Sequence, residues 1–213
     1  AVLIGGLVEI IPTIVMHRAS NVEGVRQIPY SPLQLVGRDI YIREGCYNCH
    51  SQMIRPFVGE VLRYGDFSKL GESIYDYPFQ WGSKRTGPDI HRVGGKYPHI
   101  WHLRHMENPR SVSIGSHMPN YPWLLKDKAD LDSLKSKFDV LRILGVPYPE
   151  RSGDQLRAEA LAEAKTIADD LAKSGAPVEP DSEIVALIAY LQHLGKSEPV
   201  PKAEKATGSK AGP

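Results

Sequence analysis

The segment Cys46-Tyr47-Asn48-Cys49-His50 restricts what this chain can fold into more than any other feature of the sequence. It has the pattern C-x-x-C-H, in which two thiols one turn apart can each form a thioether to a haem vinyl group. The adjacent histidine can then bind the iron. Both cysteines of the sequence lie in this motif, so neither is left for a structural disulfide or a second haem of this kind. The motif therefore predicts one covalently bound c-type haem, with His50 as its proximal ligand.

A redox-active dithiol and part of a zinc site are the two alternative interpretations of this motif. A thioredoxin-like dithiol is expected in a βαβ unit, and the residues around the motif do not have the pattern of a strand followed by a crossover helix. A structural zinc site needs about four ligands, and the sequence has no second C-x-x-C and no H-x-x-x-H pair. The pattern favours haem over both alternatives.

The charge and composition of the chain exclude one class of partner and indicate a loop-rich fold. With 26 basic and 25 acidic residues, the sequence offers no basic surface for nucleic acid, and we expect no such partner. It contains 19 glycines and 17 prolines, and residues 51–125 are rich in turn signals. A loop region of this length inside a compact domain needs something to pack on. A buried haem would supply that surface.

Residues 1–16 form the only long apolar run, which Glu9 and Pro12 interrupt. The run alone is shorter than the ~20 residues that span a bilayer, so we interpret it as the end of a helix that begins upstream. A transmembrane anchor is therefore predicted over residues 1–18, with the lipid bilayer as a partner. A cleaved signal peptide and a buried core helix are the alternatives. Glu9 would be costly against lipid, so we expect it to face a neighbouring membrane subunit.

The remaining chain is predicted to contain a linker, one helical domain and a disordered tail, at residues 19–30, 31–196 and 197–213. Ser31 can cap a helix that has proline at its first position and Gln34 at its third, which together form a capping box. This helix would deliver the haem motif at its end. Further helices are expected at residues 97–107, 126–146, 154–174 and 181–195.

A haem iron that transfers electrons needs a second axial ligand, and a methionine sulfur raises its reduction potential. We predict Met118 as this ligand, because it lies in a loop and the following Pro119 holds it in an extended conformation. Met53 is too near His50 in the sequence to reach the opposite face of the haem. His117 is the next candidate. The other two methionines are expected in helices, Met16 and Met106.

Several further residues are candidates for the wall of the haem pocket. The carbonyl of Pro88 could accept the Nδ1–H of His50 and fix the ring, as partners of metal ligands commonly do. Arg92 could pair with a haem propionate, as could Lys84 and Arg85, although a solvated charge is the ordinary alternative for each. Trp101 is a candidate wall residue, as are Trp81, Tyr97, Tyr121 and Trp123, and an ordinary core position is an equal alternative for each. The remaining histidines of this region are interpreted as surface or pocket-edge residues: His91, His99, His102 and His105.

Three segments carry a closer resemblance: GRDIYIREGCYNCHSQMIRPF, FQWGSKRTGPDIHRVGGKY and the H-x-x-NPRS…MPNYPWL run. They resemble the monohaem cytochrome c subunit of cbb3-type cytochrome c oxidase. The GLVEI segment near the start is similar to the membrane anchor of that subunit. The resemblance covers residues 1–125 and implies an all-α fold, namely a class I cytochrome c domain on a single N-terminal transmembrane helix.

In class I cytochromes the first and last helices cross through a glycine, aromatic residues and a leucine. Gly37, Tyr41, Tyr190 and Leu191 stand where that pattern expects them. Residues 126–180 are longer than a minimal cytochrome c requires. We expect this helical insertion to cover the haem domain or to contact a neighbouring subunit.

The resemblance also implies an electron-transfer subunit of a proton-translocating oxidoreductase, with no bond chemistry on this chain. Electrons would come from a dihaem cytochrome c subunit or an external cytochrome c. They would pass to the b-type haem of the catalytic haem-copper subunit, where oxygen is reduced to water. The haem domain would face the periplasm from the bacterial inner membrane. A free-standing anchored electron shuttle stays open as an alternative. A haem-based sensor is less consistent with Met118, because a sensor leaves one iron position open.

Overall fold

A computed structural model of the chain describes residues 2–20 and 24–200. The chain divides into two compact units. The first comprises Ala1–Ile28, Ile54–Gln80 and Lys196–Pro213, and the second comprises Pro29–Met53 and Trp81–Gly195. The haem motif and all the other candidate site residues belong to the second unit.

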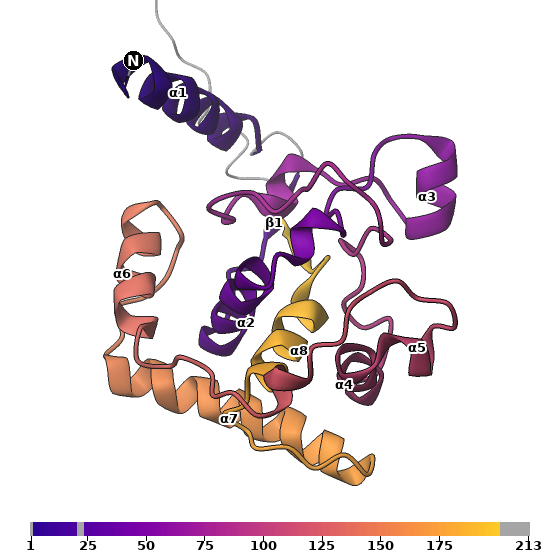
Figure 1. The fold of residues 1–213 in the computed structure, drawn as a ribbon. Coiled ribbons are helices and arrows are strands. Elements are labelled where there is room, and N and C mark those ends of the chain that lie inside the picture. Colours follow the sequence, from indigo (N-terminus) through magenta and orange to yellow (C-terminus); the bar gives the residue numbers. More distant parts are fainter. Residues whose placement is uncertain (1, 21–23, 201–213) are drawn as a thin grey trace, which may run out of the picture. The chain divides into compact units, whose positions relative to one another are not determined.

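The second unit is built on two helices that cross, α2 (Pro32–Arg43) and α8 (Glu183–His193). The predicted capping box at the start of α2 is confirmed. The hydroxyl of Ser31 accepts the N–H of Gln34 at 3.2 Å, and the N–H of Ser31 donates to the Gln34 side chain at 3.1 Å. The two helices lie side by side in Figure 1.

Gly37 is the point of closest approach between α2 and α8. A Cβ atom at this position would lie 2.0 Å from the carbonyl oxygen of Ala186 and 2.8 Å from the Cβ of Tyr190. The ring centroids of Tyr41 and Tyr190 are 5.3 Å apart, and both side chains are buried. The helix crossing predicted from Gly37, Tyr41, Tyr190 and Leu191 is therefore confirmed. Only a residue without a side chain allows this contact.

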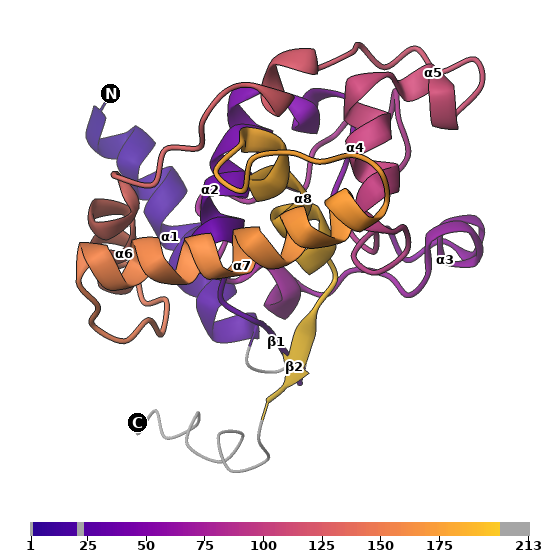
Figure 2. The ribbon, with the colours of Figure 1, turned by 90° about the horizontal axis from the view of Figure 1, so that it is seen from below.

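Two helices lie in the region 126–180, α6 (Leu134–Ile143) and α7 (Gly153–Lys173). Figure 2 shows α7 running across α2 and α8, and α6 packs against α7. The inner face of α7 belongs to the core, because Leu156 and Leu171 are fully buried. Part of this region is thus integral to the domain rather than added to its surface, whereas α6 leaves Val140 and Ile143 exposed.

The segment that follows the haem motif in the second unit is short of regular structure. It contains α4 (His99–Glu107), α5 (Pro109–Val112) and the 3-10 helix η3 (Pro122–Leu125). Helix α4 packs against α7, α8 and η3. It ends at Asn108, whose side chain caps α5 by accepting the N–H of Arg110.

The first unit corrects the prediction of an all-α fold. It contains a two-stranded antiparallel sheet in which Val25 lies opposite Pro199. The sequence did not predict these strands because each has three residues, too few for a visible alternation. They fall within the predicted linker and at the start of the predicted tail, whose residues 201–213 lie outside the described part. The elements of this unit are α1 (Val2–Ser20), β1 (Val25–Gln27), α3 (Val58–Tyr64), the 3-10 helix η2 (Leu70–Ser73) and β2 (Ser197–Pro199).

The predicted transmembrane anchor over residues 1–18 is also wrong by this structure. The apolar run does form a helix, α1, which contains Pro12. However, in the described residues no helix is both long enough and apolar enough to cross a membrane. The run is too short and is diluted by Glu9 and by the polar residues at its end. The side chain of Glu9, expected to face another subunit, lies outside what the structure describes.

Candidate haem-binding site

The C-x-x-C-H motif lies directly after α2 and forms a tight turn. Gly45 has a φ of +69°, which turns the chain from α2 into the 3-10 helix η1 (Cys46–Asn48). The N–H of His50 donates to the carbonyl of Cys46 at 2.9 Å, so both cysteines lie on one turn. Cys46 is half-buried and Cys49 is exposed. This is the local geometry that attachment of one haem to two thiols requires.

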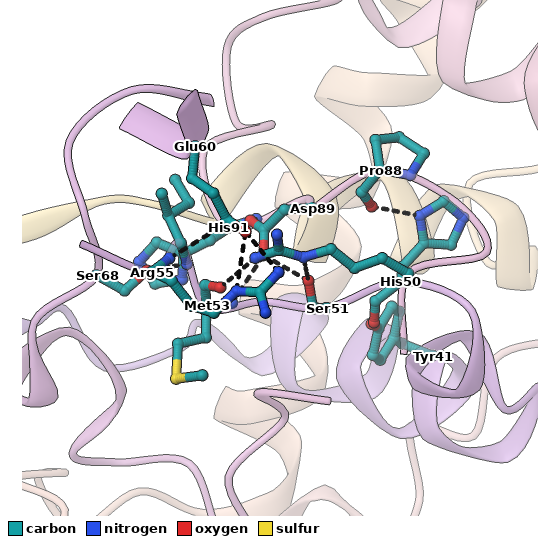
Figure 3. A network of polar contacts seen from close by, with 12 residues as sticks. Tyr41, His50, Ser51, Met53, Arg55, Glu60, Ser68, Pro88, Asp89 and His91 are labelled. Atoms are coloured by element: carbon teal, nitrogen blue, oxygen red, sulfur yellow. Dashed lines mark hydrogen bonds and ion pairs between the residues drawn. The ribbon is translucent and has the colours of Figure 1, made fainter. Parts of the chain in front are cut away.

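His50 and Pro88 are brought together as the sequence suggested. The Nδ1 atom of His50 lies 2.9 Å from the carbonyl oxygen of Pro88 (Figure 3). When Nδ1 carries the proton and donates it to this carbonyl, the lone pair of Nε2 is available to bind a metal. Gly87 lies against the ring, because a Cβ there would be 2.3 Å from its Cε1 atom. The backbone of this loop therefore fixes the ring from one side.

Backbone hydrogen bonds join the Pro88 loop to the chain that follows the motif. The N–H of Gly87 donates to the carbonyl of Cys49, and the N–H of Ile90 donates to the carbonyl of Ser51, each at 2.9 Å. These two hydrogen bonds hold the two segments side by side. Because one bond lies on each side of the His50–Pro88 contact, a movement of either segment would disturb the ring.

A buried carboxylate, Asp89, strengthens this connection. It accepts the hydroxyl of Ser51 at 2.7 Å, the N–H of Met53 at 2.9 Å and the N–H of His91 at 2.9 Å. The side chain of Arg85 donates to Ser51 at 2.6 Å and to the carbonyl of Met53 at 2.7 Å, and lies 3.4 Å from Asp89. Arg85, a candidate for a propionate, is thus part of a structural network. Asp89 was not predicted as a site residue, although its position directly after Pro88 was a usable signal.

The helix crossing supports the same loop from behind. The amide nitrogen of Gln52 donates to the hydroxyl of Tyr190 at 2.9 Å, and both side chains are buried. The hydroxyl of Tyr41 lies 3.5 Å from the carbonyl of His50. The residues that make the α2–α8 crossing thereby also position the chain on both sides of Ser51.

Three stacked aromatic rings lie along α4 and the residues before it. Tyr97 and Trp101 stack with their centroids 4.0 Å apart, and Trp101 and His105 stack at 4.6 Å. Burial lowers the pKa of His105 to about 4, and the charge of His50 contributes to this shift. His105 therefore lies near His50, and Trp101, the predicted wall residue, stacks directly on it.

Tyr121 approaches the motif from the loop between α5 and η3. Burial raises the pKa of its hydroxyl to about 12, and negative charge on Cys46, Glu44 and Cys49 adds to the shift. The N–H of Tyr121 donates to the carbonyl of Met106 on α4 at 2.8 Å. The loop that carries Met118 is thereby closed against α4, near the motif.

Met118 and Arg92 each make a hydrogen bond to a residue other than His50. Met118 is half-buried, and its N–H donates to the hydroxyl of Ser116 at 3.2 Å. Arg92 donates to the carbonyl of Gly195 at 3.4 Å, a contact that the sequence did not predict. The roles of both residues toward a haem remain predictions. Met106, by contrast, is buried in α4, as expected of a core residue.

The Cys46 thiol does not have the electrostatics of a redox-active cysteine. Burial raises the pKa of Cys46 to about 12, and negative charge on Glu44 and Cys49 adds to this. A reactive dithiol needs the opposite shift, because the thiolate is the nucleophile. Within residues 2–20 and 24–200, no cluster of three or more His, Cys, Asp or Glu side chains could hold a metal ion. The residues present fit a haem better, since the oriented His50 and the two thiols share one turn.

The oriented His50 ring and the two thiols on one turn therefore define a candidate haem-binding site. Residues 1–197 match the family described as cytochrome c oxidase, mono-heme subunit/FixO. The chain therefore belongs to this family of mono-haem subunits of cytochrome c oxidase, as the resemblance indicated. Membership implies one haem and partner subunits of an oxidase complex. No curated protein matches the chain.

Proposed function

We propose that this chain is the electron-transfer subunit of a cbb3-type cytochrome c oxidase. Cys46 and Cys49 would hold one c-type haem covalently, and His50 and Met118 would bind its iron. The observation that carries the proposal is the hydrogen bond of 2.9 Å between His50 Nδ1 and the carbonyl of Pro88, because it leaves the lone pair of Nε2 available to bind a metal. The bound haem supplies a reversible one-electron couple.

The protein itself contributes the orientation of the proximal histidine. Gly87 and Pro88 fix the plane of the His50 ring, and the Asp89 network prevents their loop from moving. The stacked Trp101 forms one wall of the pocket. Arg92, at the end of the same loop, pairs with a haem propionate. No group of this chain makes or breaks a covalent bond during turnover.

Electrons enter from a dihaem cytochrome c subunit or from an external cytochrome c. They leave to the b-type haem of the catalytic haem-copper subunit, which reduces oxygen to water. The haem-bearing unit is on the periplasmic side of the bacterial inner membrane. Family membership supports the existence of an electron donor and an electron acceptor, because a mono-haem subunit of an oxidase needs both.

Purification of the native complex through a tag on this chain tests the proposal. The haem-copper subunit and a dihaem cytochrome c subunit should purify with it, and its reduced haem should be reoxidised when oxygen is added. A variant with both Cys46→Ser and Cys49→Ser is the matched control, because it should lose the absorbance of this haem. A chain that purifies alone, with a haem that oxygen does not reoxidise, would instead be a free-standing shuttle.

A further inference from the structure

One nitrogen of His105 has no hydrogen-bond partner among the residues that the structure describes. Its Nδ1 atom is buried. The His105 ring stacks on the ring of Trp101, with an angle of 13° between the two planes and 4.6 Å between the centroids. A buried polar atom without a partner requires an explanation, and a group absent from the protein chain is one of the ordinary ones.

The surroundings of His105 show which group could satisfy this nitrogen. His105 lies near enough to His50 for the two rings to interact electrostatically. The next residue, Met106, accepts the N–H of Tyr121 at 2.8 Å, which closes the loop 113–121 against the end of α4. Met118 is in this loop. The hydrogen bond between Tyr121 and Met106 therefore joins the loop that carries Met118 to the end of the helix that carries His105.

The loop that contains Pro88 lies on one side of the His50 ring. Pro88 occupies the Nδ1 side of His50, so an iron bound by His50 would lie on the Nε2 side. A sixth ligand would have to approach from that side, and the loop that carries Met118 is bonded to the end of α4 next to His105. Burial lowers the pKa of His105 to about 4, which favours the neutral imidazole, and one of its two tautomers carries the N–H on Nδ1.

Resting on the proposed function, we infer that the Nδ1–H of His105 donates a hydrogen bond to the sulfur of Met118 when this sulfur binds the iron. The bond holds the thioether in place and withdraws electron density from it. The sulfur then stabilises ferric iron less, which favours the reduced state. His105 is a positioning residue in this arrangement, because it acts on the iron through Met118.

The test compares three forms of the full-length, haem-loaded chain. His105→Phe keeps a ring against Trp101 but removes the donor, and His105→Asn keeps an N–H near the position of Nδ1. With the phenylalanine, the sulfur-to-iron charge-transfer band of the ferric protein should shift in energy. The equilibrium between ferric and ferrous iron should move toward ferric by up to about tenfold, because only the difference in the strength of the hydrogen bond between the two states contributes and the full worth of one bond is its upper limit. The asparagine should restore most of both values.

His99→Phe is the matched control on the same helix. His99 bonds to Asp170 of α7 at 2.8 Å, and its replacement should leave the band and the potential unchanged. If His105→Phe fails to incorporate haem, His105→Leu provides a second variant without a donor.

The inference is overturned if the variants without a donor keep the wild-type band and potential. It is also overturned if the potential moves while the band does not, because His105 would then contact a propionate. A change that asparagine does not reverse would be an effect of packing and would refute it as well. A wild-type chain without covalent haem or without the band would instead overturn the proposed function itself, and this inference with it.

Discussion

Replacement of Gly87 by alanine tests how tightly the protein holds the proximal ligand. The new Cβ would lie 2.3 Å from Cε1 of His50 and 2.8 Å from its Nδ1. Carbon atoms in contact are about 3.5–4.0 Å apart, so the ring must move by more than about 1 Å. The backbone of Gly87 is held by its hydrogen bond to Cys49 at 2.9 Å, so the ring moves rather than the loop. It cannot then keep its bond to Pro88.

The size of the effect follows from the loss of that bond. Removing a hydrogen-bond partner of a metal ligand typically weakens metal binding about 10- to 100-fold, or about 1.4–2.8 kcal/mol. Protons compete with iron for Nε2, so each tenfold loss raises the pH at which His50 is released by about one unit. In G87A we therefore expect release about 1–2 pH units above the wild-type value, with the haem still attached to both cysteines.

An acid titration of the ferric protein measures this release, with the hyperfine-shifted proton resonances of the His50 ring as the signal. G59A is the control, because a Cβ at Gly59 meets no atom within 4 Å. If the release of His50 has the same midpoint in G87A and in the wild type, the loop does not fix the ring, and the reasoning is refuted.

Four further substitutions have defined outcomes. G37V would place side-chain atoms where the Cβ alone is 2.0 Å from Ala186, so the yield of folded, haem-containing protein should fall to near zero; a normal yield would contradict the helix crossing. D89N removes a buried carboxylate charge that lies 3.4 Å from Arg85, and chemical unfolding should show a loss of about 3 kcal/mol; a loss under about 0.5 kcal/mol would argue against the network. M118A should abolish the sulfur-to-iron charge-transfer band while leaving the haem bound, and survival of the band would exclude Met118 as the ligand. Burial lowers the pKa of His102 from 6.5 to about 4, so the folded state resists protonation of this ring. The free energy of unfolding should therefore decrease as the pH falls from 6.5 to 4. H102L should reduce this pH dependence, which urea titrations at pH 7 and pH 5 would measure.

The sequence predicted those parts of the fold that depend on local signals or on a repeated pattern. The capping box at Ser31 and the glycine at position 37 identified the start and the crossing of α2. The apolar face and flanking residues of α8 identified the last helix within two residues of each end. These features can be predicted from sequence because each one follows from the requirements of a single helix or a single contact.

Features that depend on contacts distant in the sequence could not be predicted in the same way. Strand β1 has three residues, and its partner lies at the other end of the described chain. Helix α3 has no buried residue, so no apolar periodicity marks it. Arg85 and Lys84 are equivalent as charges in a sequence, and only the fold shows that Arg85 reaches Ser51 and Met53.

Within the candidate site, too, some residues could be predicted from the sequence and others only from the fold. The C-x-x-C-H motif was predictable because binding a haem is the one use that fits both of its cysteines and its histidine. Pro88 followed from it as the hydrogen-bond partner of that histidine. The involvement of Asp89 required the fold, since a single aspartate has many ordinary roles. His105 was interpreted as a pocket-edge residue, and only the structure shows its buried, unpartnered nitrogen.

The mass and spectrum of the unfolded chain test the central claim most directly. After acid-acetone extraction, the wild-type protein should retain exactly one haem, because thioethers to Cys46 and Cys49 survive unfolding. The denatured chain should then exceed the mass of the polypeptide by one haem, and the double cysteine-to-serine variant should show no such excess. A wild-type chain that loses its haem to the solvent, or that carries none, would contradict the account.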